Sequence, residues 1–323
     1  MQTAPRSLHA PAGSSRMTLT NLSRGKLARP IRAIVYGVEG VGKSTFGAQA
    51  PVPIFLCAED GTAHLDVARL PVPRDWADVL EAIRILTHEE HIFKTLVIDT
   101  LDWLEPLCWA HVCATAGKPD IEAFGYGKGY AVALEAWRGL VARLDTLVRS
   151  RKMHVVLLAH CQIRKQDDPQ AGAFDRYRMK LHDKAGEVLR EWVDAVLFAR
   201  HEVRAVERNG KQRGQSSGAR LLHTEWCAAF DAKNRFDLPP ILPLDWQSFE
   251  EACKAHAPAD PEKLKAELAE LLPRLPESEQ PRLLEAISGW AGNDAARLAQ
   301  LADKARGKVF CHEAAASAEG GAS

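Results

Sequence analysis

The sequence lacks the usual features of disulfide-built, secreted and membrane-spanning proteins. Its seven cysteines include no Cys-x-x-Cys pair, and an odd, scattered set predicts reduced thiols. No apolar run approaches the roughly 20 residues of a membrane-spanning helix, and the first 16 residues lack the hydrophobic segment of a secretion signal. The formal net charge is zero, because 42 basic residues balance 42 acidic ones. These absences predict a cytoplasmic protein with no membrane partner, in which any polyanion site depends on local clustering of charge.

What is present is the composition of a globular protein. The 323 residues are 46% hydrophobic and 26% charged, enough for a sizeable core in one large or two modest domains. Pro258 and Pro261 indicate a linker, and the last residues are mostly Ala, Gly, Ser and Glu. We therefore predict a flexible extension (1–18), an α/β core (19–257), a small helical region (258–310) and a disordered tail (311–323).

Short β-branched or leucine-rich runs alternate with segments of helical periodicity. This alternation predicts a mostly parallel sheet covered by helices on both faces, which is the α/β class. The predicted strands are Ile31–Tyr36, Pro53–Cys57, Thr95–Ile98 and His154–Ala159, and the predicted helices are Asp75–His88, Leu101–Cys113 and Tyr130–Arg149. Two polar stretches interrupt the pattern: Gln162–Lys180 is predicted to be a long loop, and Glu207–Gly218 a hairpin tip with an Asn209-Gly210 turn.

One motif carries specific chemistry. The sequence GVEGVGKS matches Gly-x-x-x-x-Gly-Lys-Ser/Thr in full, after a predicted strand and at the start of a helix. Such a loop surrounds phosphate oxygens with backbone N–H groups, while the lysine reaches the β- and γ-phosphates and the serine hydroxyl contacts Mg²⁺. The sequence therefore predicts an ATP–Mg²⁺ site made by Gly37, Val38, Glu39, Gly40, Val41, Gly42, Lys43, Ser44 and Thr45.

Acidic residues at the ends of two other strands complete the predicted site. Asp99 follows the buried strand Thr95–Ile98 and is predicted to bind Mg²⁺; the alternative is a cap for the next helix. Thr100 follows Asp99, so the base that orients the attacking water must come from elsewhere. Glu59 is the leading candidate, with Asp60 as its rival, and the alternative for Glu59 is a solvated loop residue.

His160 ends the fourth predicted strand, beside the polar stretch. At that position its side chain would sense the γ-phosphate and transmit the state of the nucleotide to the loop. The alternative is a structural histidine.

Taken together, these residues resemble the RecA-like P-loop ATPases, and among them the small bacteriophage ATPases that act as single-strand-annealing recombination proteins. The resemblance covers roughly residues 19–249. It rests on the P-loop with its flanks, on Ile98–Trp103, on the segment Phe124–Tyr130 (FGYGKGY) and on Ala232–Arg235. It implies a RecA-like ATPase core that self-associates into a ring or filament with nucleotide at the subunit interfaces.

The resemblance also implies a role for Lys233 and Arg235. The run Lys233–Phe236 is similar to the Lys-Asn-Arg-Phe motif of the RadA branch, although Asp237 stands where glycine is expected. In such assemblies cations near this point reach the γ-phosphate of the adjacent subunit, and a cation acting in trans is worth about 10³–10⁵ in rate in related chemistry. The alternative is a solvated basic turn.

Basic residues cluster in one part of the chain. Between Arg149 and Arg220 there are 16 basic and 9 acidic residues, whereas from Asp260 to the end there are 8 basic and 11 acidic. Charge runs often form solvated faces, but single-strand binders combine such charge with stacking aromatics. We predict contacts to DNA by Arg164, Lys165, Arg176, Tyr177, Arg178 and Lys180.

The function predicted from the sequence is a Mg²⁺-dependent, DNA-stimulated ATPase of phage DNA metabolism in the bacterial cytosol. It would bind single-stranded DNA and promote annealing or recombination, and a single-strand-binding or replication protein is a further candidate partner. Two alternatives stay open. One is an ATP-driven DNA motor, either a ring helicase or a packaging ATPase, and the other is a nucleotide-switched assembly protein without significant turnover.

Overall fold

The computed structural model describes residues 29–59, 61–170, 172–208, 211–255, 261–288, 298, 301–302, 304–306 and 308–309. Two compact units divide the chain: Arg29–His256 form an α/β core, and the helices that follow form a second unit. The predicted extension (1–18), the first ten residues of the predicted core (19–28) and the predicted tail (311–323) lie outside the described residues.

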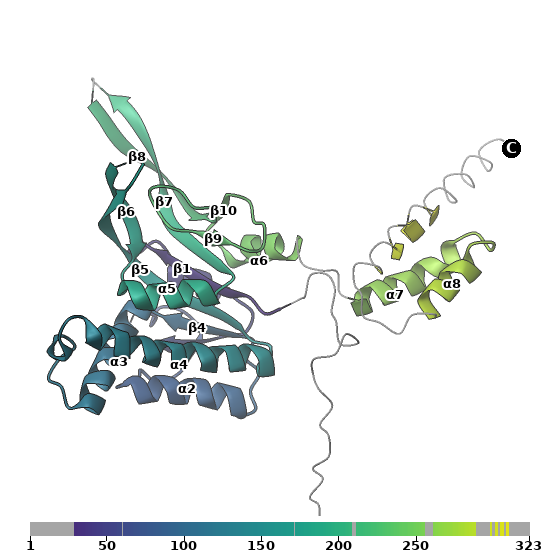
Figure 1. The fold of residues 1–323 in the computed structure, drawn as a ribbon. Coiled ribbons are helices and arrows are strands. Elements are labelled where there is room, and N and C mark those ends of the chain that lie inside the picture. Colours follow the sequence, from purple (N-terminus) through teal and green to yellow (C-terminus); the bar gives the residue numbers. More distant parts are fainter. Residues whose placement is uncertain are drawn as a thin grey trace, which may run out of the picture. The chain divides into compact units, whose positions relative to one another are not determined.

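The core is built on one mixed, mainly parallel sheet (Figure 1). Its strand order is β10-β8-β7-β1-β5-β4-β2-β3, in which neighbours from β7 to β3 are parallel, and β8 and β10 add an antiparallel edge. The strands on this path are β1 (Arg32–Gly37), β2 (Pro53–Cys57), β3 (Ala68–Arg69), β4 (Thr95–Asp99), β5 (His154–Asp168), β7 (Ala195–Arg208), β8 (Lys211–His223) and β10 (Ile241–Pro243).

The central strands bury both faces, which explains their continuous apolar sequences. In β1, Ile34 and Tyr36 face one hydrophobic cluster, while Ala33 and Val35 face the other. The first cluster is closed by α2 (Trp76–His88), α3 (Leu101–Ala116), α4 (Lys128–Arg151) and α5 (Asp183–Trp192).

Tryptophans fill the space between two of these helices. Trp76 at the start of α2 meets Trp137 of α4 edge to face, with ring centroids 5.2 Å apart. Asp75 caps α2 by accepting from the Asp78 N–H at 2.9 Å. Between α3 and α4 lies a short 3₁₀ helix, η2 (Glu122–Phe124).

The second face is covered by α1 (Lys43–Ala48) and α6 (Trp246–Ala255). Phe46 of α1 packs against Trp246 and Phe249 of α6 at centroid distances of 5.5 and 5.7 Å. Helices on both faces of a mostly parallel sheet, with further helices after the core, confirm the predicted α/β class.

The prediction of a long loop over Gln162–Lys180 is wrong. Strand β5 continues to Asp168, and β6 (Gly172–Met179) returns antiparallel to it, with Cys161 opposite Met179 and Asp168 opposite Gly172. Exposed and half-buried residues alternate along the distal part of β5, in which Ile163 is 60% exposed. A hairpin that buries so little apolar surface lacks the hydrophobic periodicity on which sequence-based recognition of strands depends.

A second hairpin, β7–β8, is longer than predicted. Arg208 pairs with Lys211, so strand structure continues along almost all of the segment that the sequence assigns to a tip. Asn209 and Gly210, the predicted turn, lie between these partners and outside the described residues. The hairpin extends from the sheet edge beside β6 (Figure 1).

The second unit is helical. It contains α7 (Pro261–Leu271), a 3₁₀ turn η3 (Leu272–Arg274) and α8 (Gln280–Ser288). A leucine cluster holds it together, formed by Leu264, Leu268, Leu271, Leu275, Leu283 and Leu298 together with Ala302, Ala305 and Val309.

Candidate functional site

The P-loop joins β1 to α1 in the expected way. Gly40 and Gly42 have left-handed φ angles of 70° and 106°, which favour glycine, and Gly42 is the N-cap of α1. Gly37 is required for another reason, since a Cβ there would lie 2.0 Å from the carbonyl oxygen of Ala199 on β7. The loop thus presents the N-terminus of α1 and its backbone N–H groups at the edge of the sheet.

Lys43, Ser44 and Asp99 are brought together by this loop. The Lys43 ammonium is buried and donates to the carbonyl oxygens of Gly37 and Val38, at 3.2 and 3.0 Å. The Ser44 hydroxyl donates to Oδ2 of Asp99 at 2.6 Å. Asp99 is only 3% exposed, so its carboxylate is directed at the P-loop rather than at solvent.

The strand register explains why these groups converge. Gly37 is opposite His160 of β5, and Cys57 of β2 is opposite Asp99 of β4. The carboxyl ends of β1, β2 and β4 therefore meet beside His160 of β5 at one edge of the sheet, where ligands of such sheets bind. Glu59, two residues beyond β2, reaches the same place.

A pocket of about 380 Å³ opens at this edge, within the size range of small-molecule sites. Its lining includes the predicted residues Gly40, Gly42, Lys43, Ser44, Thr45, Glu59, Asp99 and His160. Gly61, His64 and Arg220 also line it, and the sequence analysis missed these three because none belongs to a recognisable motif. Asp60, the rival of Glu59, lies outside the described residues.

The charges in the pocket perturb one another. Burial raises the pKa of the Glu59 and Asp99 carboxyls and lowers the pKa of the Lys43 ammonium. Neighbouring carboxylates add to the effect on Glu59, while His160 and Lys43 oppose it. A buried carboxylate with a raised pKa is a stronger base than a solvated one, which suits Glu59 to accept a proton from water.

His160 is held by a partner that the sequence analysis did not identify. Its backbone N–H and its ring Nδ1 both contact the carboxylate of Asp102 in α3, at 2.9 Å each. Burial opposes ionisation of Asp102, but the bonds from His160 outweigh it and lower the pKa of Asp102. The Asp102 carboxylate thus fixes the orientation of the imidazole at the rim of the pocket.

The residues present fit a magnesium ion bound together with a nucleotide. Among the described residues no group of three or more His, Cys, Asp or Glu side chains is arranged to hold a metal alone. Mg²⁺ in nucleotide sites needs no such cage, since it takes one or two protein oxygens with phosphates and water. The Ser44 hydroxyl and the Asp99 carboxylate supply that pair.

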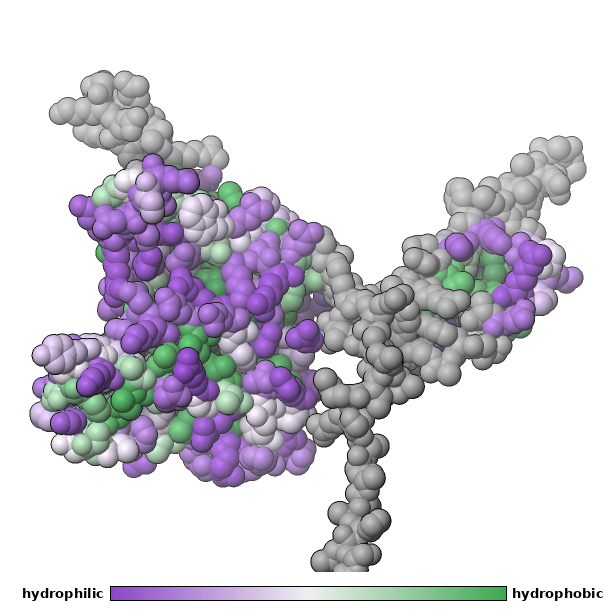
Figure 2. All heavy atoms as spheres, in the orientation of Figure 1, coloured by the Kyte–Doolittle hydropathy of each residue, from purple (hydrophilic) through white to green (hydrophobic). Residues whose placement is uncertain are grey.

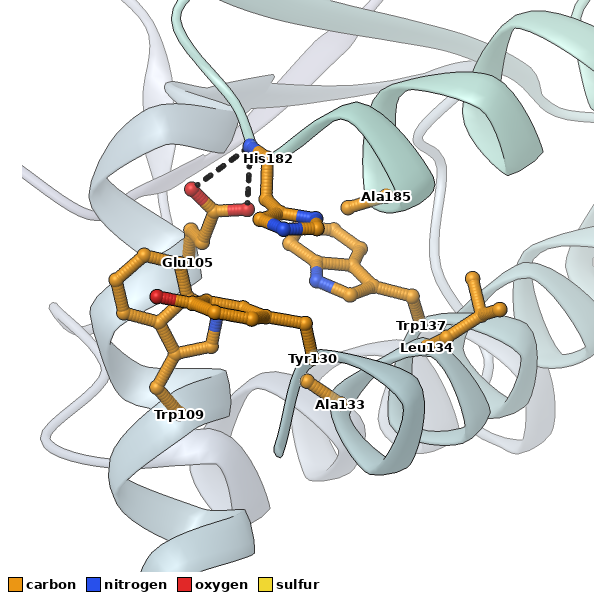
Figure 3. A pocket seen from close by; sticks show the side chains of 8 residues that line it. All are labelled: Glu105, Trp109, Tyr130, Ala133, Leu134, Trp137, His182 and Ala185. Carbon is orange, nitrogen blue, oxygen red and sulfur yellow. Dashed lines mark hydrogen bonds between the residues drawn. The ribbon is translucent and has the colours of Figure 1, made fainter. Parts of the chain in front are cut away.

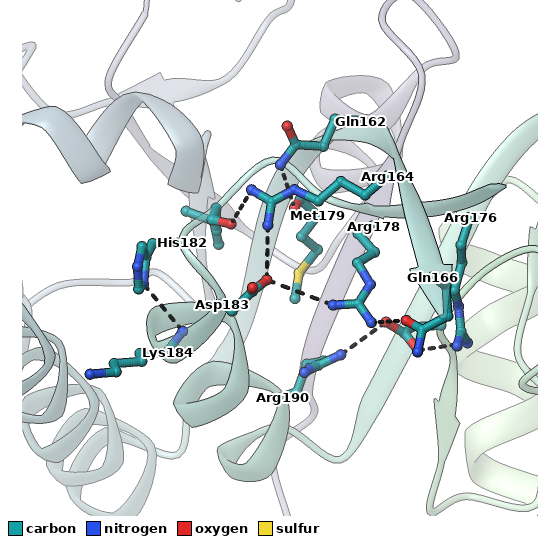
Figure 4. A network of polar contacts seen from close by, with 12 residues as sticks. Gln162, Arg164, Gln166, Arg176, Arg178, Met179, His182, Asp183, Lys184 and Arg190 are labelled. Carbon is teal, nitrogen blue, oxygen red and sulfur yellow. Dashed lines mark hydrogen bonds and ion pairs between the residues drawn. The ribbon is translucent and has the colours of Figure 1, made fainter. Parts of the chain in front are cut away.

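The residues predicted to contact DNA lie on the β5–β6 hairpin and at its base, but they differ in accessibility. Lys165 and Lys180 are exposed, with Asp175 opposite Lys165. Arg164 and Arg178 are less exposed and share Asp183 at the start of α5, at 3.0 and 3.7 Å (Figure 4). Hydrophilic side chains dominate this side of the core in Figure 2.

Two members of the predicted DNA set are engaged within the chain. The Arg176 side chain is 7% exposed and pairs with Asp231 at 2.7 Å, besides donating to the carbonyl oxygens of Cys227 and Phe230. Tyr177 packs against Phe198, with centroids 5.1 Å apart, and is partly buried in the core. Both side chains thus have partners within the chain and are less exposed than Lys165 and Lys180.

Lys233, predicted to act in trans, is also engaged within its own chain. Its ammonium donates to the carbonyl oxygens of Arg190, Glu191 and Val193 at the C-terminus of α5, at 2.6, 3.1 and 2.7 Å. Desolvation lowers the pKa of Lys233. The Arg235 side chain, by contrast, is 53% exposed, with Asp194 at 3.4 Å. The structure thus gives Lys233 a helix-capping role and leaves the Arg235 side chain about half exposed.

Comparisons with known proteins bear on the fold and the family. Residues 29–236, about two thirds of the chain, match the family described as an AAA domain. The chain belongs to this AAA-domain family. None of the curated proteins matches the sequence. Among solved structures the chain is similar to one titled "Crystal structure of the RadB recombinase", with 12% identity and a TM-score of 0.40, covering 68% of this chain and 90% of that one.

Membership of the AAA-domain family agrees with the P-loop fold described above, and such a fold implies nucleotide binding. The match includes every strand that supplies the site, from β1 to β9 (Lys233–Asn234). None of the helices in the described part of the AAA domain or of the second unit has both the length and the apolar character needed to cross a bilayer.

The AAA domain contains a second cluster of aromatic and titratable groups, between α3, α4 and α5 (Figure 3). Tyr130 stacks on His182 with centroids 4.1 Å apart, and both oxygens of Glu105 accept from the His182 backbone N–H, at 2.9 and 3.2 Å. Burial raises the pKa of the Glu105 carboxyl to about 7. The side chains fill this space, so we interpret the cluster as a structural device that anchors the start of α5.

Glu105 makes stability depend on pH. Because its pKa is raised in the folded state, the folded protein holds this proton more tightly, and stability falls as pH rises from about 4.5 to about 7. We expect Glu105→Gln to remove this dependence, worth at most about 3 kcal/mol. Urea unfolding of wild type and variant from pH 5 to pH 8 measures it. The difference between the two isolates Glu105, because other titrations are common to both; identical pH profiles would contradict the account.

The Lys233 cap predicts different stabilities for two substitutions that lie two residues apart. Lys233→Met removes three hydrogen bonds to the end of α5 and should lower the free energy of unfolding by about 1–3 kcal/mol. Arg235→Ala, the matched control two residues away, should lower it by less than about 1 kcal/mol. Urea unfolding tests both variants. An unchanged stability for Lys233→Met would contradict the cap.

Proposed function

We propose that this protein is an ATP- and Mg²⁺-dependent ATPase, stimulated by single-stranded DNA, that promotes annealing of single strands in recombination. The ATPase part of the proposal rests on one observation: Lys43, Ser44 and Asp99 lie together at one edge of the sheet, with Glu59 in the same pocket. The resemblance to phage single-strand-annealing ATPases supports the recombination part and a role in phage DNA metabolism.

Each group has a distinct task in the proposed reaction. The P-loop N–H groups and Lys43 bind and orient the phosphates, and the Ser44 hydroxyl and Asp99 would hold Mg²⁺, which neutralises charge on the phosphates when bound. Glu59 accepts the proton of the attacking water. His160, held by Asp102, lies between the pocket and the β5–β6 hairpin and reports the state of the nucleotide to it.

Self-association completes the proposed site. In P-loop ATPases an arginine supplied by another subunit adds to the P-loop lysine and stabilises the charge that develops on the γ-phosphate, which speeds hydrolysis. Arg235 is exposed enough to reach the nucleotide of a neighbouring subunit in this way. Hydrolysis would then depend on assembly into a ring or filament.

The DNA surface in this proposal is the exposed part of the β5–β6 hairpin with its neighbours. Lys165, Lys180, Arg164 and Arg178 supply charge for phosphates. Trp226 replaces Tyr177 as the stacking residue, since it is 62% exposed and the Arg176 guanidinium lies 5.0 Å from its ring centroid. A cation on one side of an indole leaves the other face for a base.

ATP hydrolysis tests the enzymatic part. We expect turnover that rises with single-stranded DNA and much less with duplex DNA, and stimulation that fades with salt. Lys43→Ala should abolish nucleotide binding, whereas Glu59→Gln should retain binding and lower turnover at least about 100-fold. Binding without turnover under every DNA condition would contradict the ATPase and favour a nucleotide-switched assembly protein. ATP-driven strand separation would favour a motor.

Binding to fluorescent oligonucleotides tests the DNA surface. Lys165→Ala/Lys180→Ala should weaken affinity for single strands about tenfold and flatten its salt dependence. The matched control, Lys94→Ala/Lys118→Ala, removes two exposed lysines elsewhere and should change neither. Trp226→Ala should lower the affinity for single strands about tenfold or more. Equal losses for both lysine pairs would show only a nonspecific effect of net charge and would contradict the surface.

A further inference from the structure

Arg220 on β8 reaches the P-loop of its own chain. It lines the nucleotide pocket together with Gly40, Gly42 and Lys43. A Cβ placed on Gly42 would lie 2.7 Å from Nη1 of Arg220. The guanidinium therefore lies against the residue that begins α1, although 178 positions separate the two residues in the sequence.

The backbone of Arg220 is held from both sides. Arg220 is opposite His201 of β7, two residues past Ala199, which is opposite Gly37 of β1. Its carbonyl oxygen accepts from the Leu244 N–H at 3.0 Å. The side chain thus starts from the ordered root of the β7–β8 hairpin, close to the end of the P-loop strand.

An irregularity in the ladder lies next to Arg220. Between the pairs His201–Arg220 and Val203–Ser216, one residue of β7 faces three of β8. Gly218 in this bulge has a left-handed φ of 81°, and the Ala219 N–H donates to the Ser217 hydroxyl at 3.2 Å. Bulges beside functional sites redirect side chains and bend the strand, and this one separates the root of the hairpin from its distal arm.

The Arg220 guanidinium shares the pocket with the carboxylates of Glu59 and Asp99. The residues that the structure describes offer its guanidinium no hydrogen-bond or ion-pair partner. A planar guanidinium presents a fork of donors that matches two phosphate oxygens. Next to a loop whose N–H groups already face a phosphate site, this unused fork points to an anion.

We infer that Arg220 binds a phosphate of the nucleotide in cis and so couples nucleotide binding to the β7–β8 hairpin. This inference rests on the proposed nucleotide site and adds a contact to it. The distal arm that the contact would orient carries Arg204, Arg208, Lys211 and Arg213 against one acid, Glu207. Nucleotide binding would therefore fix the position of a basic arm through a single side chain at its root.

Nucleotide affinity and hydrogen exchange test the inference together. Binding of a non-hydrolysable ATP analogue with Mg²⁺ should weaken about 10–100-fold in Arg220→Ala and less in Arg220→Lys, which keeps the charge but not the fork. Arg143→Ala on α4, an exposed arginine of the same domain, serves as the matched control and should bind normally. At saturating analogue, amides of residues 201–222 should gain protection in wild type and not in Arg220→Ala.

The outcomes separate this inference from the function on which it rests. If wild type binds no nucleotide, or Lys43→Ala binds as tightly as wild type, the nucleotide site itself fails. If wild type binds and Lys43→Ala does not, but Arg220→Ala binds within twofold with the same protection, the role of Arg220 is overturned. Loss of DNA affinity in Arg220→Ala with nucleotide affinity unchanged would also overturn it, by assigning the arginine to the nucleic-acid surface.

Discussion

The register of the parallel strands is the constraint on which the site depends. With Gly37 opposite His160 and Cys57 opposite Asp99, the ends of β1, β2 and β4 meet beside His160 at one edge of the sheet. The short Ser44–Asp99 hydrogen bond then ties the P-loop helix to a strand that is not adjacent to β1 in the sheet. A slip of one residue in any of these pairings would turn the strand's side chains to the opposite face and separate the groups.

Electrostatics give the same picture of the site. Glu59, Asp99 and Asp102 lie around one buried ammonium, and burial raises the pKa of Glu59 and Asp99. Carboxylates gathered in this way are destabilised unless a cation joins them. A divalent ion held by Ser44 and Asp99 would stabilise the ionised form of these carboxylates.

The sequence predicts some parts of the molecule well because their signals are local. The P-loop and the apolar strand before Asp99 each occupy a few consecutive residues with one dominant interpretation. The polar sequences of β5 and β6 favour a loop, whereas the two strands pair as a hairpin in the structure. Other features depend on contacts between segments that are distant in the sequence. These are the pairing of Asp102 with His160, the capping role of Lys233 and the approach of Arg220 to Gly42. No periodicity or motif encodes such contacts.

The magnesium dependence of ATP binding, measured by isothermal titration calorimetry in wild type and Asp99→Asn, tests the central claim most directly. In wild type, Mg²⁺ should tighten binding about tenfold or more, a gain of about 1.4 kcal/mol. Asp99→Asn should lose most of this gain, while Glu135→Gln on the exposed face of α4 should keep it. Two results would contradict the assignment of this edge of the sheet as a magnesium–nucleotide site. One is an ATP affinity of the wild type that does not change with Mg²⁺, and the other is a full magnesium effect on ATP affinity in Asp99→Asn.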